Sequence, residues 1–135
     1  MIVVDTHVVA YFFLPSAHTP LADALYEQDP DWAAPLLWRS ELRNILAGYL
    51  RRGHLSFEAA LRVQAEAEDL LAGSDYDVDS RRVLELVRDS DCSAYDCEFV
   101  ALAERLGVPL VTSDSKLLRA FPGRARPLAG STQPT

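Results

Sequence analysis

Residues 93–114, SAYDCEFVALAERLGVPLVTSD, decide how the rest of the chain is read. Apolar residues recur at helical spacing until Gly107 stops the helix, and the compact apolar run 108–112 predicts a buried strand. A helix followed by a buried strand is half of a βαβ unit. Asp96 lies in the first turn of this helix, and Asp114 follows the strand at its carboxyl end, where open parallel sheets place ligand-binding groups.

The composition predicts one soluble domain. The chain has 135 residues, of which 49% are hydrophobic and 24% charged, enough to bury a single core. We assign residues 1–128 to this domain and expect the Gly-, Ser-, Thr- and Pro-rich residues 129–135 to form a flexible tail. The first residues, MIVVDTH, carry no basic leader, and no uncharged run approaches the ~20 residues of a membrane span, so we expect a cytoplasmic protein.

The net charge neither shows nor excludes a nucleic-acid substrate. The formal charge of −7 argues against a protein that coats a phosphate backbone with basic surface. Of the thirteen basic residues, however, only Lys116 is a lysine and the others are arginines, which bind phosphate in a bidentate manner. That usage is also what a biased genomic composition would produce.

Strand-like and helix-like segments alternate along the chain, and this predicts a three-layer α/β/α sandwich with a mainly parallel central sheet. The expected strands are residues 2–4, 32–34, 75–78, 108–112 and 126–128. The expected helices are residues 6–14, 19–28, 37–52, 56–73, 79–87, 93–106 and 115–121.

Four acids are expected at one edge of this sheet. Asp5 follows the first strand as Asp114 follows a later one, and Asp96 begins the helix that precedes that later strand. Glu41 lies beside the apolar face of helix 37–52, where an unpartnered glutamate is rare. If strands 2–4 and 108–112 are neighbours, as at a topological switch point, all four carboxylates converge on one crevice.

Helix capping is the alternative explanation for the aspartates. Asp5 and Asp114 each precede a helix, and Ser93-x-x-Asp96 is a capping pattern, so capping accounts for each aspartate taken singly. Glu41 has no such explanation. Two like charges ~4 Å apart cost on the order of 4 kcal/mol at an effective dielectric of 20, and a divalent metal is the simplest relief for four of them.

The strings IVVDTHVVAYF, LWRSELRNIL and KLLRAF, together with the opening stretch, resemble the PIN-domain family and, within it, the VapC-type toxins of bacterial toxin–antitoxin pairs. The resemblance extends to about Leu128. It is most specific in D-x-x-F-V-A-L-A-x-x-L-G-V-P-L-V-T-x-D, which runs from Asp96 to Asp114.

The resemblance implies a Mg²⁺- or Mn²⁺-dependent endoribonuclease that acts as a toxin, with one or two ions in the active site. The family's acids fall on Asp5, Glu41, Asp96 and Asp114. Its usual hydroxyl neighbours fall on Thr6 and Thr112, and Ser113 flanks the fourth acid as a further supporting candidate. The implied partners are RNA, a second copy of the chain, and a small antitoxin that wraps a helical groove and directs an arginine toward the acids.

Carboxylates suit this chemistry because their hard oxygens bind Mg²⁺ or Mn²⁺ alongside waters and substrate phosphates. A metal-activated water needs no His or Ser nucleophile. We expect Asp5 and Asp96 to bind the principal ion, with Glu41 and Asp114 completing the cluster directly or through water.

The other polar residues have open roles. The histidines, His7, His18 and His54, lie on separate elements without metal-ligand spacing, which favours structural or exposed positions. The cations near the acids could contact phosphate or form ordinary ion pairs; they are Arg39, Arg43, Arg51, Arg52 and Lys116. Cys92 and Cys97 have neither redox nor zinc spacing and are expected to be small buried hydrophobes.

Two other classes of protein stay open: a different Mg²⁺-dependent phosphate-processing domain on a similar sheet, and a non-catalytic interaction module. A DxD phosphatase would need a second acid where His7 stands, and a receiver domain would need paired acids before its phospho-acceptor strand. The apolar run 11–14 and the helix that carries Trp38 suggest a surface that a partner covers.

Overall fold

A five-stranded parallel sheet forms the centre of the protein, and the computed structural model describes residues 1–131. The strands are β1 (Ile2–Val4), β2 (Trp32–Pro35), β3 (Asp75–Tyr76), β4 (Leu110–Thr112) and β5 (Ala125–Pro127), in the order β3-β2-β1-β4-β5. Every pair of neighbouring strands is parallel. The predicted α/β sandwich with a mainly parallel sheet is therefore confirmed.

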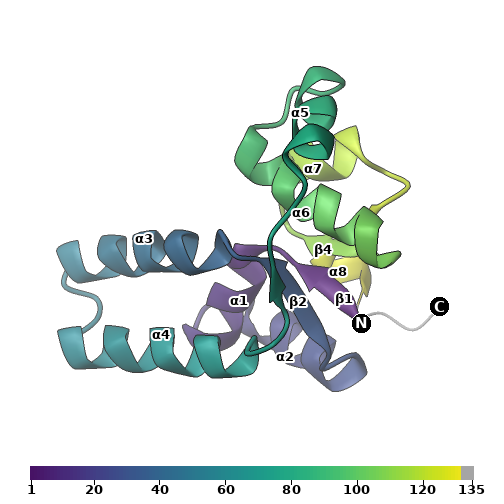
Figure 1. The fold of residues 1–135 in the computed structure, drawn as a ribbon. Coiled ribbons are helices and arrows are strands. Elements are labelled where there is room, and N and C mark those ends of the chain that lie inside the picture. Colours follow the sequence, from purple (N-terminus) through teal and green to yellow (C-terminus); the bar gives the residue numbers. More distant parts are fainter. Residues whose placement is uncertain (132–135) are drawn as a thin grey trace.

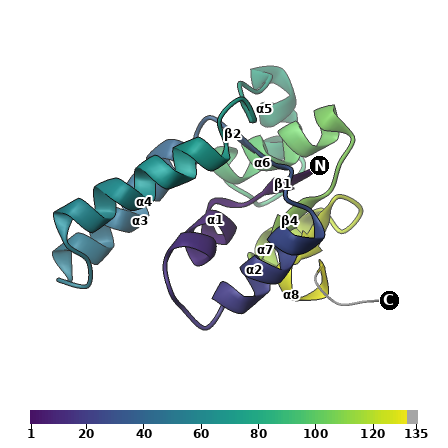
Figure 2. The same ribbon diagram turned by 90° about the horizontal axis from the view of Figure 1, so that it is seen from below.

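Helices cover both faces of this sheet (Figures 1 and 2). They are α1 (Thr6–Phe13), α2 (Thr19–Gln28), α3 (Trp38–Arg51), α4 (Phe57–Leu70), α5 (Ser80–Arg88), α6 (Ala94–Leu106), α7 (Ser115–Ala120) and α8 (Leu128–Ser131). Helices α5 and α6 pack together on one face, and α1 and α2 pack together on the other. Helices α3 and α4 run side by side as a two-helix arm that extends away from the sheet (Figure 1).

The chain changes direction across the sheet at β1. From β1 it passes to β2 and β3 on one side, and it then returns to place β4 and β5 on the other side. Val4 pairs with Val111, and the Asp5 amide donates to the Val111 carbonyl at 3.0 Å. The expected contact between the strands at residues 2–4 and 108–112 is thus present as the pairing of β1 with β4. Their carboxyl ends lie side by side at one edge of the sheet.

Helix α6 is apolar on almost every side because it is enclosed by the sheet and α5. Its residues from Phe99 to Ala103 are all buried. Gly107 ends the helix with a φ of 69°, a left-handed conformation that suits glycine. The Val108 amide then turns back to the Ala103 carbonyl, and Pro109 has no amide hydrogen, so the strand ladder begins at Leu110, two residues later than the sequence predicted.

The chain ends its described part in α8, which includes residues 129–131 of the predicted flexible tail. Leu128 is buried, and α8 packs on α2. The flexibility of residues 129–135 stays a prediction. The rest of the predicted tail, residues 132–135, lies outside the described residues. No helix within residues 1–131 is both long and apolar enough to cross a membrane.

The apolar surface that the sequence suggested for a partner is largely core. Leu14 and Trp38 are buried, and the Trp38 indole nitrogen donates to Asp75 Oδ2 at 3.1 Å. The Phe12 ring packs against those of Tyr26 and Trp32, with centroids 4.9 and 5.2 Å apart. The suggestion is therefore wrong for these residues, because helical periodicity does not distinguish a face that meets a sheet from one that meets a partner. The buried, free Cys92 and Cys97 agree with prediction.

Candidate active site

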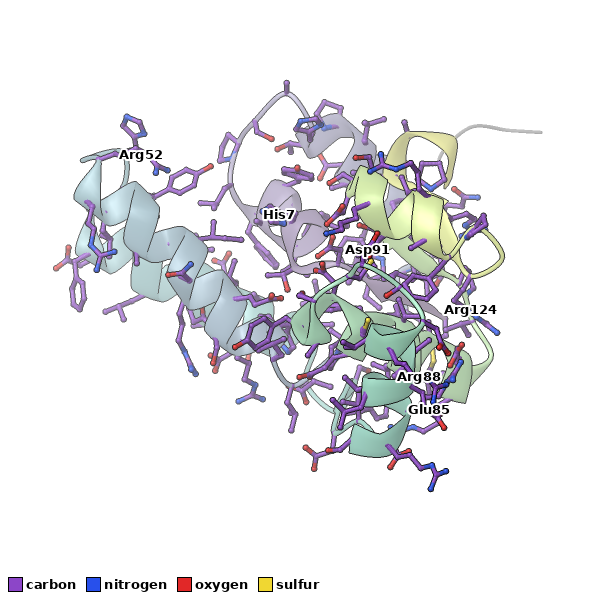
Figure 3. All side chains as sticks on the ribbon, turned by 90° about the horizontal axis from the view of Figure 1, so that it is seen from above. His7, Arg52, Glu85, Arg88, Asp91 and Arg124 are labelled. Carbon is purple, nitrogen blue, oxygen red and sulfur yellow. The ribbon has the colours of Figure 1, made fainter. Side chains whose placement is uncertain are left out.

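A pocket of about 420 Å³ lies at the carboxyl edge of the sheet, and the four predicted acids all line it. Its lining residues are Asp5, Thr6, His7, Leu37, Ser40, Glu41, Asn44, Ile45, Tyr95, Asp96 and Asp114. Figure 3 shows His7 on α1, between the α3–α4 arm and the part of the molecule that holds α5 and α6. The lining contains four carboxylates and neither lysine nor arginine. We call it the acidic pocket.

Asp5 is presented to the acidic pocket by the turn from β1 into α1. It occupies the N-cap position with extended backbone angles, yet its side chain makes no capping hydrogen bond. Instead, the Thr112 hydroxyl donates to Asp5 Oδ2 at 2.6 Å and accepts from the Asp114 amide at 3.0 Å. Thr112 is fully buried at the end of β4. One hydroxyl therefore orients two of the acids from the neighbouring strand.

Glu41 is held from a different direction. It lies in the first turn of α3, and the buried Thr6 hydroxyl of α1 donates to its Oε1 at 2.6 Å. The pKa of Glu41 is raised, chiefly by burial and further by the charges of Asp5 and Asp96, while the Thr6 hydrogen bond and His7 act in the opposite direction. The hydrogen bond fixes the carboxylate but does not neutralise it.

Asp96 and Asp114 line the acidic pocket from opposite ends of residues 93–114. Ser93 Oγ caps α6 by accepting from the Asp96 amide at 3.0 Å, which leaves the Asp96 carboxylate at the pocket. Burial raises the pKa of Asp96, and Asp114 and Asp5 raise it further. Asp114 does cap α7, since its Oδ1 accepts from the amides of Lys116 and Leu117 at 2.8 and 3.4 Å. Capping and pocket lining are therefore compatible for Asp114.

The donor set fits a hard divalent cation. All four acidic groups are carboxylates, and burial together with the neighbouring acids raises the pKa of Glu41 and of Asp96. Within residues 1–131, however, no three acidic, histidine or cysteine side chains lie in a ready-made ligand cluster. The acids share a pocket without converging on one point, so metal ligation by Asp5, Glu41, Asp96 and Asp114 stays a prediction.

Several pocket residues were missed from the sequence, and one candidate lies elsewhere. Asn44 follows Glu41 by three residues, and that spacing alone places both on one side of α3. Ser40 and Tyr95 each directly precede a predicted acid, and no sequence pattern marks either of them as a pocket residue. Ser113 is exposed outside the pocket lining, with its hydroxyl 3.4 Å from that of Tyr11.

Most arginines on the arm are engaged with other residues. Arg39 Nε lies 2.9 Å from Asp75 Oδ2, and Arg43 lies 3.9 Å from Glu68. The Arg52 guanidinium, at the end of the arm in Figure 3, sits 5.2 Å from the centre of the Tyr49 ring. These contacts favour the ion-pair and packing explanation for these arginines.

Comparison with known proteins agrees with this architecture. A model of the PIN-domain family matches residues 2–121, a region that contains all four acids. The chain belongs to the PIN-domain family. It is similar to Ribonuclease VapC3 of Pyrobaculum aerophilum, with 27% identity over an alignment 139 residues long. The alignment covers 93% of this chain and 98% of that protein. The resemblance drawn from the sequence motifs is confirmed.

Proposed function

We propose that this PIN-domain protein is a Mg²⁺- or Mn²⁺-dependent endoribonuclease and the toxin of a toxin–antitoxin pair. Family membership and the similarity to a protein named as a VapC ribonuclease support the proposal. The observation that carries it is the acidic pocket, where four carboxylates from distant parts of the chain meet without a lysine or arginine in the lining.

In this mechanism Asp5 and Asp96 would hold the principal ion, and Glu41 and Asp114 would complete the cluster directly or through water. When bound, the divalent ion lowers the pKa of a water molecule and offsets the negative charge of the phosphodiester. The Thr112 hydroxyl, at the end of β4, holds the Asp5 carboxylate and the Asp114 amide. The Thr6 hydroxyl holds the Glu41 carboxylate in the acidic pocket. These buried hydroxyls preorganise the acids before substrate arrives.

Glu41 is also suited to handle a proton. Thr6 occupies its Oε1, which leaves Oε2 to accept a proton from the attacking water, and burial raises the pKa of the Glu41 carboxyl. Leu37 and Ile45 flank Glu41 in the lining and limit the water around it. The scissile phosphate would lie between Glu41 on the arm and Asp96 on α6.

The pocket also explains how an antitoxin could inhibit this enzyme. A cationic side chain would be attracted to the four carboxylates and would occupy the space proposed for the ions. We propose a cytoplasmic location, a homodimer and a small antitoxin partner, as the resemblance to VapC-type toxins implies.

The decisive experiment is cleavage of total cellular RNA by the purified protein with Mg²⁺ or Mn²⁺, with the cut ends mapped. We expect wild type to cut at defined positions and Asp96→Asn to be slower by at least ~100-fold, since a major electrostatic group is lost. Expression of wild type, but not of Asp96→Asn, should slow bacterial growth. Circular dichroism should show that the variant is folded.

Two results would contradict the proposal. Undiminished cleavage by Asp96→Asn, or by wild type in excess EDTA, would show that the acidic pocket is not the catalytic site. No Mn²⁺ binding to wild type in a calorimetric titration, combined with no cleavage, would favour a non-catalytic interaction module.

A further inference from the structure

We propose that Lys116 and Arg119 form a phosphate-binding subsite that holds the RNA strand next to the acidic pocket. The inference deepens the proposed ribonuclease function and rests on it. It assigns a role to the single lysine of the chain and to one arginine of α7.

A second hollow of about 300 Å³ lies between the α5–α6 loop and α7. Lys116 and Arg119 line it from α7, and Ser90 and Cys92 line it from the loop, whose Asp91 is labelled in Figure 3. Lys116 and Arg119 are three residues apart on one helix, a spacing that brings side chains to roughly 5–6 Å at Cβ. Both cations can therefore contact one phosphodiester group.

This hollow adjoins the acidic pocket. Asp114 lines the acidic pocket and caps α7, so Lys116 follows a proposed catalytic acid by two residues. Cys92, which lines the hollow, is buried beneath it. A strand that places one phosphate at the acids thus has its next phosphates near α7.

The two cations are available for a ligand. Within residues 1–131, neither Lys116 nor Arg119 has a carboxylate within 4.0 Å, unlike Arg39 and Arg82, which are paired. Asp89 in the hollow is occupied by Arg88, with two hydrogen bonds of 2.8 and 3.0 Å. Asp91 is the remaining acid there, and it is exposed.

The charge of the protein gives such a subsite a use. An RNA strand approaching the acidic pocket meets four carboxylates on a chain of net charge −7, and the lining of that pocket offers no lysine or arginine. Contacts from Lys and Arg to phosphates hold a strand in position without reading its sequence. Lys116 and Arg119 supply these contacts beside the reacting group.

The test is the binding of fluorescein-labelled octauridylate in EDTA, measured by anisotropy at several salt concentrations. We expect Lys116→Gln and Arg119→Gln each to weaken binding about 3- to 10-fold and to lower the slope of log K against log salt by about 0.7, as for one lost phosphate contact. Arg62→Gln is the matched control, because Arg62 is an exposed arginine of α4 that lines neither hollow. It should bind as wild type does.

The subsite and the nuclease proposal fail in different ways. If Lys116→Gln and Arg119→Gln bind octauridylate like Arg62→Gln, or if wild type does not bind it, the subsite is wrong even where wild type cuts RNA. If both variants bind weakly but wild type never cuts with Mn²⁺, the subsite holds and the nuclease proposal fails. With active enzyme, Lys116→Gln should raise KM and leave kcat unchanged, since it contacts the strand away from the acids.

Discussion

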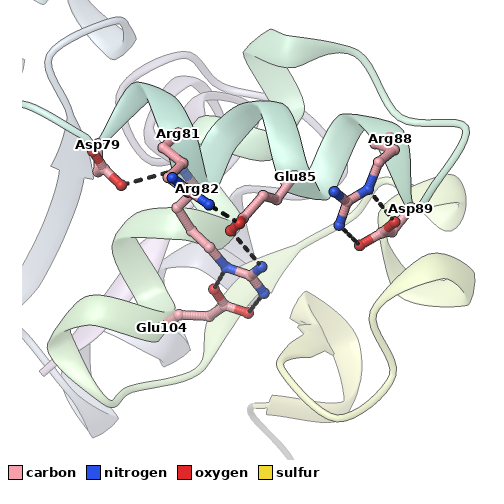
Figure 4. Close-up of polar contacts among 7 residues, drawn as sticks. All are labelled: Asp79, Arg81, Arg82, Glu85, Arg88, Asp89 and Glu104. Carbon is pink, nitrogen blue, oxygen red and sulfur yellow. Dashed lines mark hydrogen bonds and ion pairs between the residues drawn. The ribbon is translucent and has the colours of Figure 1, made fainter.

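Carboxylates gather both in the acidic pocket and in the Arg82 cluster, which consists of Arg82, Glu85 and Glu104 between α5 and α6, but only the cluster pairs them with an arginine. In the cluster, Arg82 donates to both Glu104 oxygens at 2.7 and 3.0 Å and to Glu85 at 3.3 Å (Figure 4). The pKa of Glu104 is lowered by the Arg82 hydrogen bonds. In the acidic pocket, the pKa values of Glu41 and Asp96 are raised.

The contrast separates a structural role from a functional one. A carboxylate whose charge is already compensated joins two helices and has little left to offer a ligand. A carboxylate left uncompensated destabilises the empty site, and that cost is relieved when a cation binds. The cluster also borders a hollow of about 340 Å³, but its charges are already paired there. Pocket size alone therefore does not distinguish the two hollows, whereas the pairing of their charges does.

Outside the four acids, the largest effect is expected from Thr112→Val, which keeps the shape of the side chain and removes the hydroxyl that holds Asp5 and the Asp114 amide. We expect Mn²⁺ affinity and RNA cleavage to fall about 10- to 100-fold, as for other groups that orient metal ligands. Thr112→Ser retains the hydroxyl and is the matched control. Calorimetric Mn²⁺ titration and cleavage rates check both; equal values for the Val variant and wild type would refute the role of Thr112.

A smaller effect is expected from Arg82→Met in the paired cluster. The variant should lose about 0.5–1.5 kcal/mol of unfolding free energy, a modest value because the Arg82 side chain is 42% exposed. Its cleavage rate should equal that of wild type. Arg81→Met is the control, since Arg81 is 86% exposed and reaches only Glu85, at 3.5 Å. Urea unfolding measures both, and a loss of cleavage in Arg82→Met would end the distinction between the two regions.

The smallest effect is a pH-dependent gain in stability for Glu41→Gln in metal-free buffer. Because the folded-state pKa of Glu41 is raised, its contribution to stability is fully present below the unfolded pKa of about 4.3 and is lost as pH rises through the folded value. The melting temperature of the variant should therefore be about 2–5 °C above that of wild type at pH 7. Near pH 3.5 the two melting temperatures should be equal.

Glu104→Gln is expected to change the melting temperature in the opposite direction in the same experiment. The folded pKa of Glu104 is lowered, so its contribution is present above the unfolded pKa and disappears as pH falls through the folded value. This variant should melt below wild type at pH 7. Scanning calorimetry at the two pH values checks both, and a fall in the melting temperature of Glu41→Gln at pH 7 would contradict the assignment of uncompensated charge.

Much of the fold could be predicted from local patterns. Strand β1 and helix α2 appear at the predicted residues, and β2 extends only one residue further. The alternation of buried strands and helices leads to a parallel sheet because short connections leave few other arrangements. The ends of α6 followed from Ser93 and Gly107, whose cap and left-handed turn are local preferences.

The sequence by itself determined the elements and which acids stand at their ends, since periodicity and caps act over a few residues. Tertiary structure decided which charges are paired: among residues 1–131 it gave Arg82 to Glu104, whereas Glu41 and Asp96 line a pocket without lysine or arginine, and Lys116 has no carboxylate within 4.0 Å. It also buried Trp38 in the core. Pairing and burial depend on which distant segments meet, and that depends on the packing of the whole sheet and its helices.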